Sequence, residues 1–537
     1  MADAAVAEKK GADEKFLVLP ILVLILAQMG TSGDNGALSL AASALQSDLG
    51  ATLADIQLAN MVYSLMAGAF MIAGGLMGTI IGWKKNFRVG ALLCAAGEVV
   101  LAFAPSMMIF TWVGRVLVGF GASFMIPSVL GLVPKIYFGK NRVLAFGCIG
   151  AASGLSALLP LILGVVMQLA GMKITFLVLA VYFLIVFALS FKLPEIDESG
   201  EKSKFDGIGV ALAALGLFMF LIGIAKVSTW GLWEPFAGAP SIMGVSPALP
   251  LAIAGLVVLA VLVKVEKKVE EKNGSALIPQ SFLTTPQVLA GLAASAITFF
   301  FMGVQSILMG PYLMLVAGWS PIQVGVSSIV VGAPTFAFSM GIPKFFPNAN
   351  PRRVIQIGYL VMALALGVMA MAVTIDGASM MGIYAGCVFA GSGAGIVSAQ
   401  ANNVVALAVN DRDAAQSGGI QTTMRNVGQA IGVALLGAVL LFSITNSVNG
   451  AAQQSANLSD STKAIVAEMP LSLNGDAEFT AQLEAAGVAD QAEIDELIAL
   501  NQQSRFDSTR LAYGVGAAII LLGLLTTPAI KVFKKEA

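Results

Sequence analysis

The chain is built from a long series of apolar stretches, each about as long as a bilayer is thick. A helix needs about 20 apolar residues to cross the hydrocarbon core, and within lipid only helices and closed barrels satisfy their own backbone hydrogen bonds. The 537 residues are 57% hydrophobic and 11% charged, whereas soluble domains carry about 25% charged residues. The sequence therefore predicts an all-α integral membrane protein.

We predict fourteen membrane-spanning helices in three groups. Six precede a charged segment at 192–206, two follow it, and six come after a second charged segment at 264–287. This layout predicts an N-terminal six-helix bundle at 1–191, a linker with two extra helices at 192–285, and a C-terminal six-helix bundle at 286–537. The predicted spans are 16–46, 56–81, 88–104, 107–134, 143–170, 174–191, 207–227, 247–263, 286–316, 321–343, 354–373, 379–408, 414–446 and 511–530.

Positive charge is distributed unevenly over the predicted loops. With the N-terminus in the cytoplasm, 23 of the 30 Lys and Arg residues fall in cytoplasmic segments and only four on the opposite side. This bias agrees with the positive-inside rule. An even number of spans then places both termini in the cytoplasm. We expect a multi-pass protein of the cytoplasmic (inner) membrane of a prokaryote, with no cleaved signal peptide at Met1–Lys15.

Composition excludes several classes of function. The chain has no histidine, so His-ligated zinc and imidazole proton relays are excluded. The net charge of −1 gives no basis for a nucleic-acid partner. We find no metal-ligand cluster, cofactor motif or nucleophile–base set, and expect neither an enzyme nor a cofactor. Membrane lipids are the expected surroundings of what we expect to be a monomer.

Asp34 is an ionisable residue within the first predicted span, and it is the most informative residue about function. It lies in the glycine-rich run Gly30–Gly36, which follows the apolar stretch Phe16–Met29. A charge at membrane depth costs roughly 2.5–3.5 kcal/mol on insertion scales, so such residues usually line a transport pathway. A carboxyl group holds its proton more tightly when buried and less tightly beside a cation. Asp34 is therefore a candidate proton carrier, and the alternative is a fixed ion pair with Arg115 that only joins two spans.

Two further charged residues lie within predicted spans. Glu98 has no partner that the sequence identifies, and it is either a second proton site or a protonated carboxyl bonded to a neighbouring helix. Arg425 lies among amide side chains on two adjacent predicted helices. It either contacts a substrate head group or takes part in interhelical hydrogen bonds, which average about 0.6 kcal/mol each in membranes.

The predicted outer segment at 447–509 is acidic. It holds ten Asp and Glu residues but only two basic ones. Asp490-x-x-Glu493 resembles a capping box, and apolar residues follow it at helical spacing. We expect either one or two amphipathic helices over the outer mouth or a mobile, solvated loop between the last two spans.

Four motifs carry a family resemblance. The run Gly33-Asp34-Asn-Gly is followed by Asp55-Ile-Gln57-Leu-Ala-Asn60-Met-Val-Tyr63. The fourth span contains Gly114-Arg115-Val-Leu-Val-Gly-Phe-Gly-Ala, and a later span reads Gln416-Ser-Gly-Gly-Ile-Gln-Thr-Thr-Met-Arg425-Asn-Val-Gly. Together they resemble the fourteen-span drug:proton antiporters of the major facilitator superfamily, over nearly the whole chain.

This resemblance implies two six-helix bundles, plus two inserted helices, that alternate access to a central site. It implies multidrug efflux, with proton-coupled export of amphipathic or hydrophobic compounds and with Asp34 and Arg115 in the coupling. The cavity-facing residues expected are Asn60, Tyr63, Gln305, Asn402 and Arg425. The alternative is a carrier of an organic anion or a lipid-like molecule that does not exchange protons, because three basic residues lie in spans against two acids.

Two motifs depart from the family pattern. The cytoplasmic gate loop of such transporters carries an aspartate and an arginine, where this chain has Thr79 and Ile80. We expect Gly75, Gly82, Lys84 and Lys85 to form the gate instead. The fifth-span antiporter motif keeps only its first glycines, which leaves the transport direction and the proton coupling open.

Overall fold

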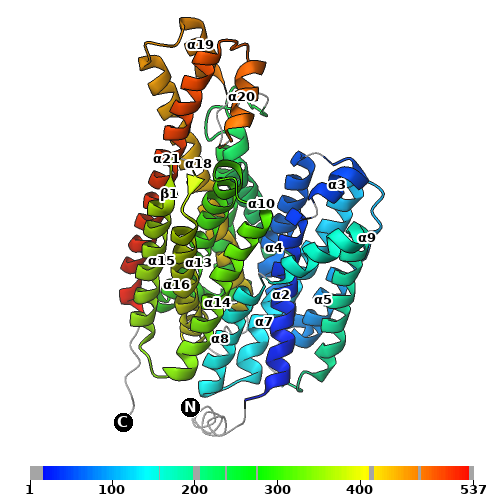
Figure 1. Ribbon diagram of the computed structural model, residues 1–537. Helices are drawn as coiled ribbons and strands as arrows, with labels where there is room; N and C mark the ends of the chain where they lie inside the picture. Colours follow the sequence, from blue (N-terminus) through cyan, green and yellow to red (C-terminus); the bar gives the residue numbers. More distant parts are fainter. Residues whose placement is uncertain are drawn as a thin grey trace.

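The computed structural model describes residues 16–40, 42–51, 53–156, 158–196, 206–235, 239–273, 276–375, 377–409, 417–469, 473 and 475–530. Almost all of them are helical. Figure 1 shows two groups of helices side by side, with the described chain starting and ending at the lower end of the view. The predicted positions of the extreme termini fall on residues outside the described ranges.

The first group of helices, here called the first half, is followed by a short middle section. The first half contains α2 (Val18–Leu40), α3 (Ala42–Leu49), α4 (Leu53–Ile81), α5 (Trp83–Ala102), α6 (Met107–Ile109), η1 (Phe110–Arg115), α7 (Val116–Ile136), α8 (Gly139–Leu155), α9 (Leu158–Leu189) and η2 (Ser190–Lys192). The middle section contains α10 (Gly207–Trp230), α11 (Ala248–Asn273) and α12 (Gln280–Thr284).

The remaining elements form the second half. They are α13 (Pro286–Pro311), η3 (Tyr312–Val316), α14 (Pro321–Phe345), α15 (Pro351–Ala372), α16 (Met380–Ala406), α18 (Ser417–Gln454), α19 (Asp460–Glu468), α20 (Asp476–Ala485), α21 (Gln491–Leu522) and η4 (Gly523–Ala529). A two-stranded antiparallel ribbon joins α15 to α16, with β1 (Val373–Thr374) paired to β2 (Gly377–Ala378).

Among the described residues, eleven helices are long and apolar enough to cross a membrane, and Val18–Asp34 is a shorter apolar helix. The prediction of an all-helical, multi-pass chain is confirmed. Three of the fourteen predicted spans do not meet the same criterion. The span at 16–46 is divided between α2 and α3, the span at 88–104 lies in α5, and the span at 143–170 is divided between α8 and α9.

Local sequence explains these differences. The helix α5 begins at Trp83, earlier than predicted, and Lys84, Lys85 and Arg88 make its first turns polar. The helix α9 begins at Leu158 with a proline at its third position, where the missing N–H has no intrahelical acceptor. The same helix is broken at Gly171, whose φ of 78° is readily adopted only by glycine.

Each half has a hydrophobic core of its own. One cluster of buried apolar residues runs from Ile21 to Leu193, and a second runs from Ala290 to Ile530. The inserted helices α10 and α11 pack on each other, and α10 also packs on α4 and α18, which come from different halves. The insertion therefore lies at the seam between two separately packed bodies.

Glycines permit close helix packing inside the first half. A Cβ added at Gly74 of α4 would lie 1.8 Å from the backbone oxygen of Ser123 in α7. The Asn86 amide on α5 donates to the Gly74 and Phe124 carbonyls, at 2.9 and 3.0 Å, and to Ser128 Oγ at 2.9 Å. One buried amide thereby joins three helices, as is common where small residues let membrane helices approach.

The two halves touch through glycine-rich surfaces, where α4 meets α18 and α8 meets α14. In α4, a Cβ at Gly75 would lie 3.1 Å from the Gly419 Cα of α18. Between α8 and α14, Ser339 Oγ donates to the Gly147 carbonyl at 2.9 Å, and a Cβ at Gly154 would lie 2.3 Å from the Gly332 oxygen. At these contacts the backbones of the two halves approach each other closely.

The acidic insertion is helical in its described parts. Figure 1 shows α19 and α20 standing with the ends of α18 and α21 above the second half, not over the first half. The reciprocal capping box predicted at Asp490 and Glu493 is not formed. Asp490 accepts from the Ala492 N–H, whereas the Glu493 carboxylate accepts from the Ser459 N–H and the Thr462 hydroxyl. Glu493 thus holds the start of α19.

The close contact at Gly74 predicts a strong effect on stability. We expect Gly74→Ala to lower the thermal unfolding midpoint of the detergent-solubilised protein, because overpacking typically costs roughly 1–3 kcal/mol. Gly367→Ala is the matched control, since nothing lies within 4 Å of its added Cβ. It should leave the midpoint unchanged or raise it, because alanine is the better helix former. Equal midpoints for the two variants would contradict the packing described here.

Candidate functional site

The strongest polar contact inside the first half joins Asp34 on α2 to Arg115 at the start of α7. Arg115 Nη1 lies 2.9 Å from both Oδ1 and Oδ2 of Asp34. Both side chains are 0% exposed. The sequence predicted that these residues act together, and the structure brings them into one ion pair. A buried ion pair adds little to the stability of a protein compared with apolar residues of similar size. Removing one partner, however, strongly destabilises the protein, because the other charge is left buried and unpaired.

Three groups on neighbouring helices surround the ion pair. Arg115 Nε donates to the Ala59 carbonyl at 3.4 Å, and its guanidinium carbon lies 4.6 Å from the centre of the Tyr63 ring. The Tyr63 hydroxyl donates to the Thr31 carbonyl at 2.9 Å. Tyr63 therefore holds α2 and α4 around the pair, while Arg115 Nη2 is buried without a hydrogen-bond acceptor.

Arg115 ends a six-residue π-helix, η1, that joins α6 to α7. A π-helix is wider than an α-helix and is frequent at functional sites, because it changes the direction in which the following side chains point. The helix α7 is also packed closely on α5, where a Cβ at Gly97 would lie 2.5 Å from a methyl carbon of Val118.

Glu98 follows Gly97 on that face of α5 and is 0% exposed. Its carboxyl group interacts electrostatically with Asp34 and Arg115 and lies within hydrogen-bonding range of the Asp34 carboxyl group. The structure thus gathers Asp34, Arg115 and Glu98 into one buried cluster. From sequence alone, no residue could be named as a partner of Glu98.

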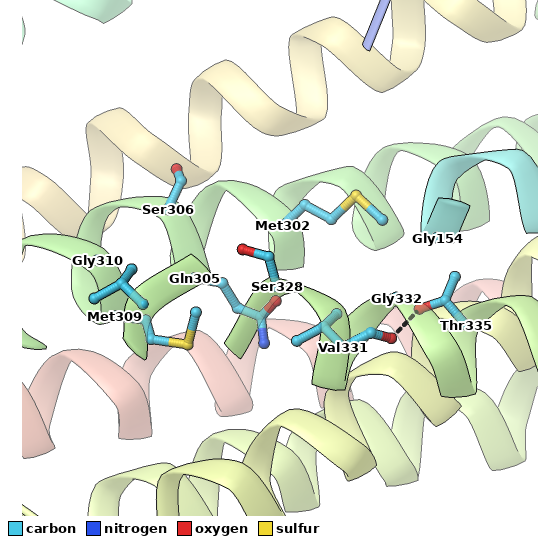
Figure 2. A pocket seen from close by; sticks show the side chains of 11 residues that line it. Gly154, Met302, Gln305, Ser306, Met309, Gly310, Ser328, Val331, Gly332 and Thr335 are labelled. Carbon is cyan, nitrogen blue, oxygen red and sulfur yellow. Dashed lines mark hydrogen bonds between the residues drawn. The ribbon is translucent and has the colours of Figure 1, made fainter. Parts of the chain in front are cut away.

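A cavity of about 350 Å³ lies between α13, α14 and α8. Figure 2 shows the lining side chains, which include the thioethers of Met302 and Met309 and the Gln305 amide. Gln305 is the one predicted cavity residue that lines it. The lining residues are Gly154, Met302, Gln305, Ser306, Met309, Gly310, Val324, Ser328, Val331, Gly332 and Thr335.

A second polar cluster lies on α16 and α18. Arg425 Nη2 donates to Asn402 Oδ1 at 2.7 Å, and the guanidinium carbon lies 5.2 Å from the centre of the Phe299 ring on α13. Arg425 is 8% exposed and Asn402 is 1% exposed. The predicted pair is therefore in contact, although neither residue lines the 350 Å³ cavity.

The other predicted residues are dispersed. Asn60 is half-buried on α4, and its Oδ1 has no hydrogen-bond partner. Gly75 meets Gly419 at the contact between the halves, and Gly82 links α4 to α5 with a φ of 94°. Lys84 Nζ donates to the Pro194 carbonyl at 3.2 Å, and Lys85 is exposed. Of these gate residues, Gly75 contacts the opposite half, whereas the described hydrogen bond of Lys84 stays within the first half.

Sequence reasoning missed three groups that the structure places at these sites. They are the Thr31 and Ala59 carbonyls and the Phe299 ring. Backbone carbonyls carry no sequence signal. Phe299, however, precedes Met302 by one helical turn, and that spacing could have placed it on the face that carries Gln305. Among the described ranges, no group of His, Cys, Asp and Glu side chains could hold a metal ion.

Comparisons with known proteins give the chain a family. The family model described as Major Facilitator Superfamily matches residues 24–433. The "Probable actinorhodin transporter" of Streptomyces coelicolor is 29% identical over 77% of this chain and 70% of its own length. The "Tetracenomycin C resistance and export protein" of Streptomyces glaucescens is 27% identical over 78% of this chain and 75% of its own length.

A third relative and a solved structure extend the comparison. The "Methyl viologen resistance protein SmvA" of Salmonella typhimurium is 23% identical over 80% of this chain and 84% of its own length. The crystal structure of the human organic anion transporter MFSD10 (TETRAN) has a TM-score of 0.60 and 12% identity, and the match covers 95% of this chain and 98% of that one. The similarity to the human transporter structure concerns the fold alone. With its family match across residues 24–433, the chain belongs to the Major Facilitator Superfamily of membrane transporters, as its intramembrane motifs predict.

Proposed function

We propose that the protein exports amphipathic small molecules by alternating access, driven by protons that enter through the Asp34–Arg115–Glu98 cluster. The observation that carries this proposal is a fully buried ion pair that interacts with a second buried carboxyl group. The names of the relatives support the export of small molecules, since they include antibiotic transport and resistance. The proposal extends that role to this chain.

The proposed setting is the cytoplasmic membrane of a prokaryote, with a monomer that crosses it fourteen times and keeps both termini inside. The eleven apolar helices account for most of the spans, and α2, α5 and the α8–α9 segment would supply the other three. The domains proposed are 1–191, 192–285 and 286–537. Two separate hydrophobic cores support the division into two bundles.

Charge balance gives the cluster a way to carry a proton. Asp34 and Arg115 neutralise each other, so an ionised Glu98 would leave a net negative charge in a fully buried site. Burying an unpaired charge is costly, and the protonated acid avoids that cost. Arg115 Nη2 still has no acceptor. In the proposed cycle, a proton moves between the two acids while Arg115 stays paired with whichever is ionised.

Access to the cluster must change during transport. Asp34, Glu98 and Arg115 are each 0% exposed in this conformation, so protons reach them only after helices move. The contacts at Gly75–Gly419 and Gly147–Ser339 close the end that we propose to be cytoplasmic. The cavity lies farther along α13 and α14, toward the opposite end. We therefore propose that this is an outward-facing conformation of the transporter.

Removing the Asp34 carboxylate should abolish proton-driven transport. A pH difference of one unit is worth about 1.4 kcal/mol per proton, so it can drive about tenfold accumulation of a neutral compound for each proton exchanged. We expect Asp34→Asn to lose that accumulation in proteoliposomes while still equilibrating the compound. The measurement is uptake of a panel of cationic, neutral and anionic fluorescent amphiphiles. Unchanged accumulation of every panel member would contradict the proposal.

Glu98 should matter for protons but not for folding. Glu98→Gln keeps the shape of the side chain and removes its ability to release a proton. We expect an unchanged unfolding midpoint, together with fewer protons exchanged per substrate bound, as measured with a pH-sensitive dye in weakly buffered detergent solution. Glu484→Gln, in the outer helix α20, is the control that removes an acid elsewhere. Wild-type proton exchange by Glu98→Gln would exclude Glu98 from the coupling.

Joining α4 to α18 should stop the transport cycle. The backbones at Gly75 and Gly419 are close enough for a cysteine pair to be cross-linked, and the three native cysteines are buried and unpaired. We expect cross-linked Gly75→Cys/Gly419→Cys protein to bind ligand but not transport it, with recovery after reduction. The two single variants are the controls. Full transport by the quantitatively cross-linked protein would rule out opening at this contact.

A further inference from the structure

We infer that Arg425, together with the amides of Asn402 and Gln421, binds the anionic group of an amphipathic aromatic substrate. This inference rests on the proposed transport function and names the class of compound carried. Its basis is a buried cation that no carboxylate among the described residues balances. Buried amide N–H groups of Asn402 and Gln421 without acceptors lie on the same two helices, and α13 connects the cation to the apolar cavity.

The positive charge of Arg425 is not compensated by the described part of the protein. Arg115 pairs with Asp34 and Arg505 pairs with Asp476, whereas Arg425 contacts only the Asn402 amide oxygen and the face of Phe299. No charged residue is among the groups that influence it electrostatically. A buried charge without a counter-ion is costly unless a ligand supplies one. The site is therefore suited to a negative group.

The neighbouring amide side chains have N–H groups without hydrogen-bond acceptors. Gln421 lies one helical turn before Arg425 on α18 and is 0% exposed. Neither its Nε2 nor its Oε1 forms a hydrogen bond, and Asn402 Nδ2 is also buried without an acceptor. Buried polar atoms are nearly always paired in folded proteins. Unpaired N–H groups beside an arginine fork match the oxygens of a carboxylate or phenolate, which accept several hydrogen bonds at once.

The helix α13 connects this polar site to the cavity. Phe299, which lies against Arg425, precedes Met302 by one turn, and Met302 lines the cavity with Gln305 and Met309. Figure 2 shows Met302, Gln305 and Met309 of α13 among the lining side chains, with Val331 of α14. Thioethers and an aromatic face suit a flat apolar ring system. The ring system would occupy the cavity while its acidic group reaches inward to Arg425.

The lining of the cavity argues against a cationic substrate. None of its residues is acidic, so nothing there would balance a positive charge. The buried acids of the first half, Asp34 and Glu98, are 0% exposed and are occupied by the Arg115 cluster. A cationic group placed beside Arg425 would instead be repelled. Charge complementarity thus selects an anion through both attraction and repulsion.

The test compares three compounds that share one ring system and differ only in charge. They are anthracene-2-carboxylate, anthracene-2-carboxamide and anthracen-2-ylmethylammonium. Affinity is measured by fluorescence with the whole protein in lipid nanodiscs at pH 8, where the acid is ionised. We expect the wild type to bind the acid at least tenfold more tightly than the amide. Arg425→Gln should remove that difference, and Arg425→Lys should restore part of it.

Controls separate charge recognition from folding and from proton coupling. Lys226→Gln removes a positive charge near Trp230 and should leave the preference for the acid unchanged. Gln421→Leu should weaken binding of the acid more than binding of the amide. Equal affinities for all three compounds, a preference for the cation, no binding of the acid, or an unchanged preference in Arg425→Gln would each overturn the inference.

Failure of the anion site and failure of proton-driven export give different results in these experiments. If proton-driven export is wrong, a pH gradient will fail to drive uptake of any of the three compounds, although the binding preference for the acid remains. If the anion site is wrong, the gradient will drive transport but the compounds will bind with no preference for the acid.

Discussion

The buried pair of Asp34 and Arg115 is the interaction on which the rest of the first half depends. Its members come from α2 and from η1, which leads into α7. Tyr63 of α4 and Glu98 of α5 lie beside the pair. Removing one partner would leave a charge stranded in a site with no exposure to solvent. That energetic constraint makes the four helices act as one unit. Our proposal places the protonation step of transport at this site for that reason.

The two halves handle charge in opposite ways. In the first half, one buried cation faces two buried acids, so the cluster is neutral when one of the two acids is protonated. In the second half, the described contacts of Arg425 are the Asn402 amide and the Phe299 ring, and our inference assigns its balancing charge to the substrate. Between the halves, glycines of α4, α8, α14 and α18 approach the opposite backbone closely. Contacts of that kind depend on shape and can separate without breaking a buried salt bridge, as alternating access requires.

Sequence patterns found some parts of this site more readily than others. Asp34 and Arg115 were identifiable because ionised residues in apolar helices are rare, and their pairing followed from the family motifs. Glu98 stood out for the same reason, but its neighbours depend on how α5 packs against α7 through Gly97. Tyr63 was expected to face the cavity, whereas the structure places it against Arg115 with its hydroxyl bonded to the Thr31 carbonyl. Periodicity defines a helix face but does not say which neighbour covers it.

The sequence by itself determined that the chain is helical and embedded in a membrane, because long apolar stretches with few charges have no other stable arrangement in lipid. It also determined which residues carry charge at depth. Only the tertiary structure decided which of those residues meet, where α9 is broken, and how Glu493 came to cap α19 instead of its own helix. Those outcomes depend on contacts between segments that are far apart in the chain. Local sequence does not specify which distant segments come into contact.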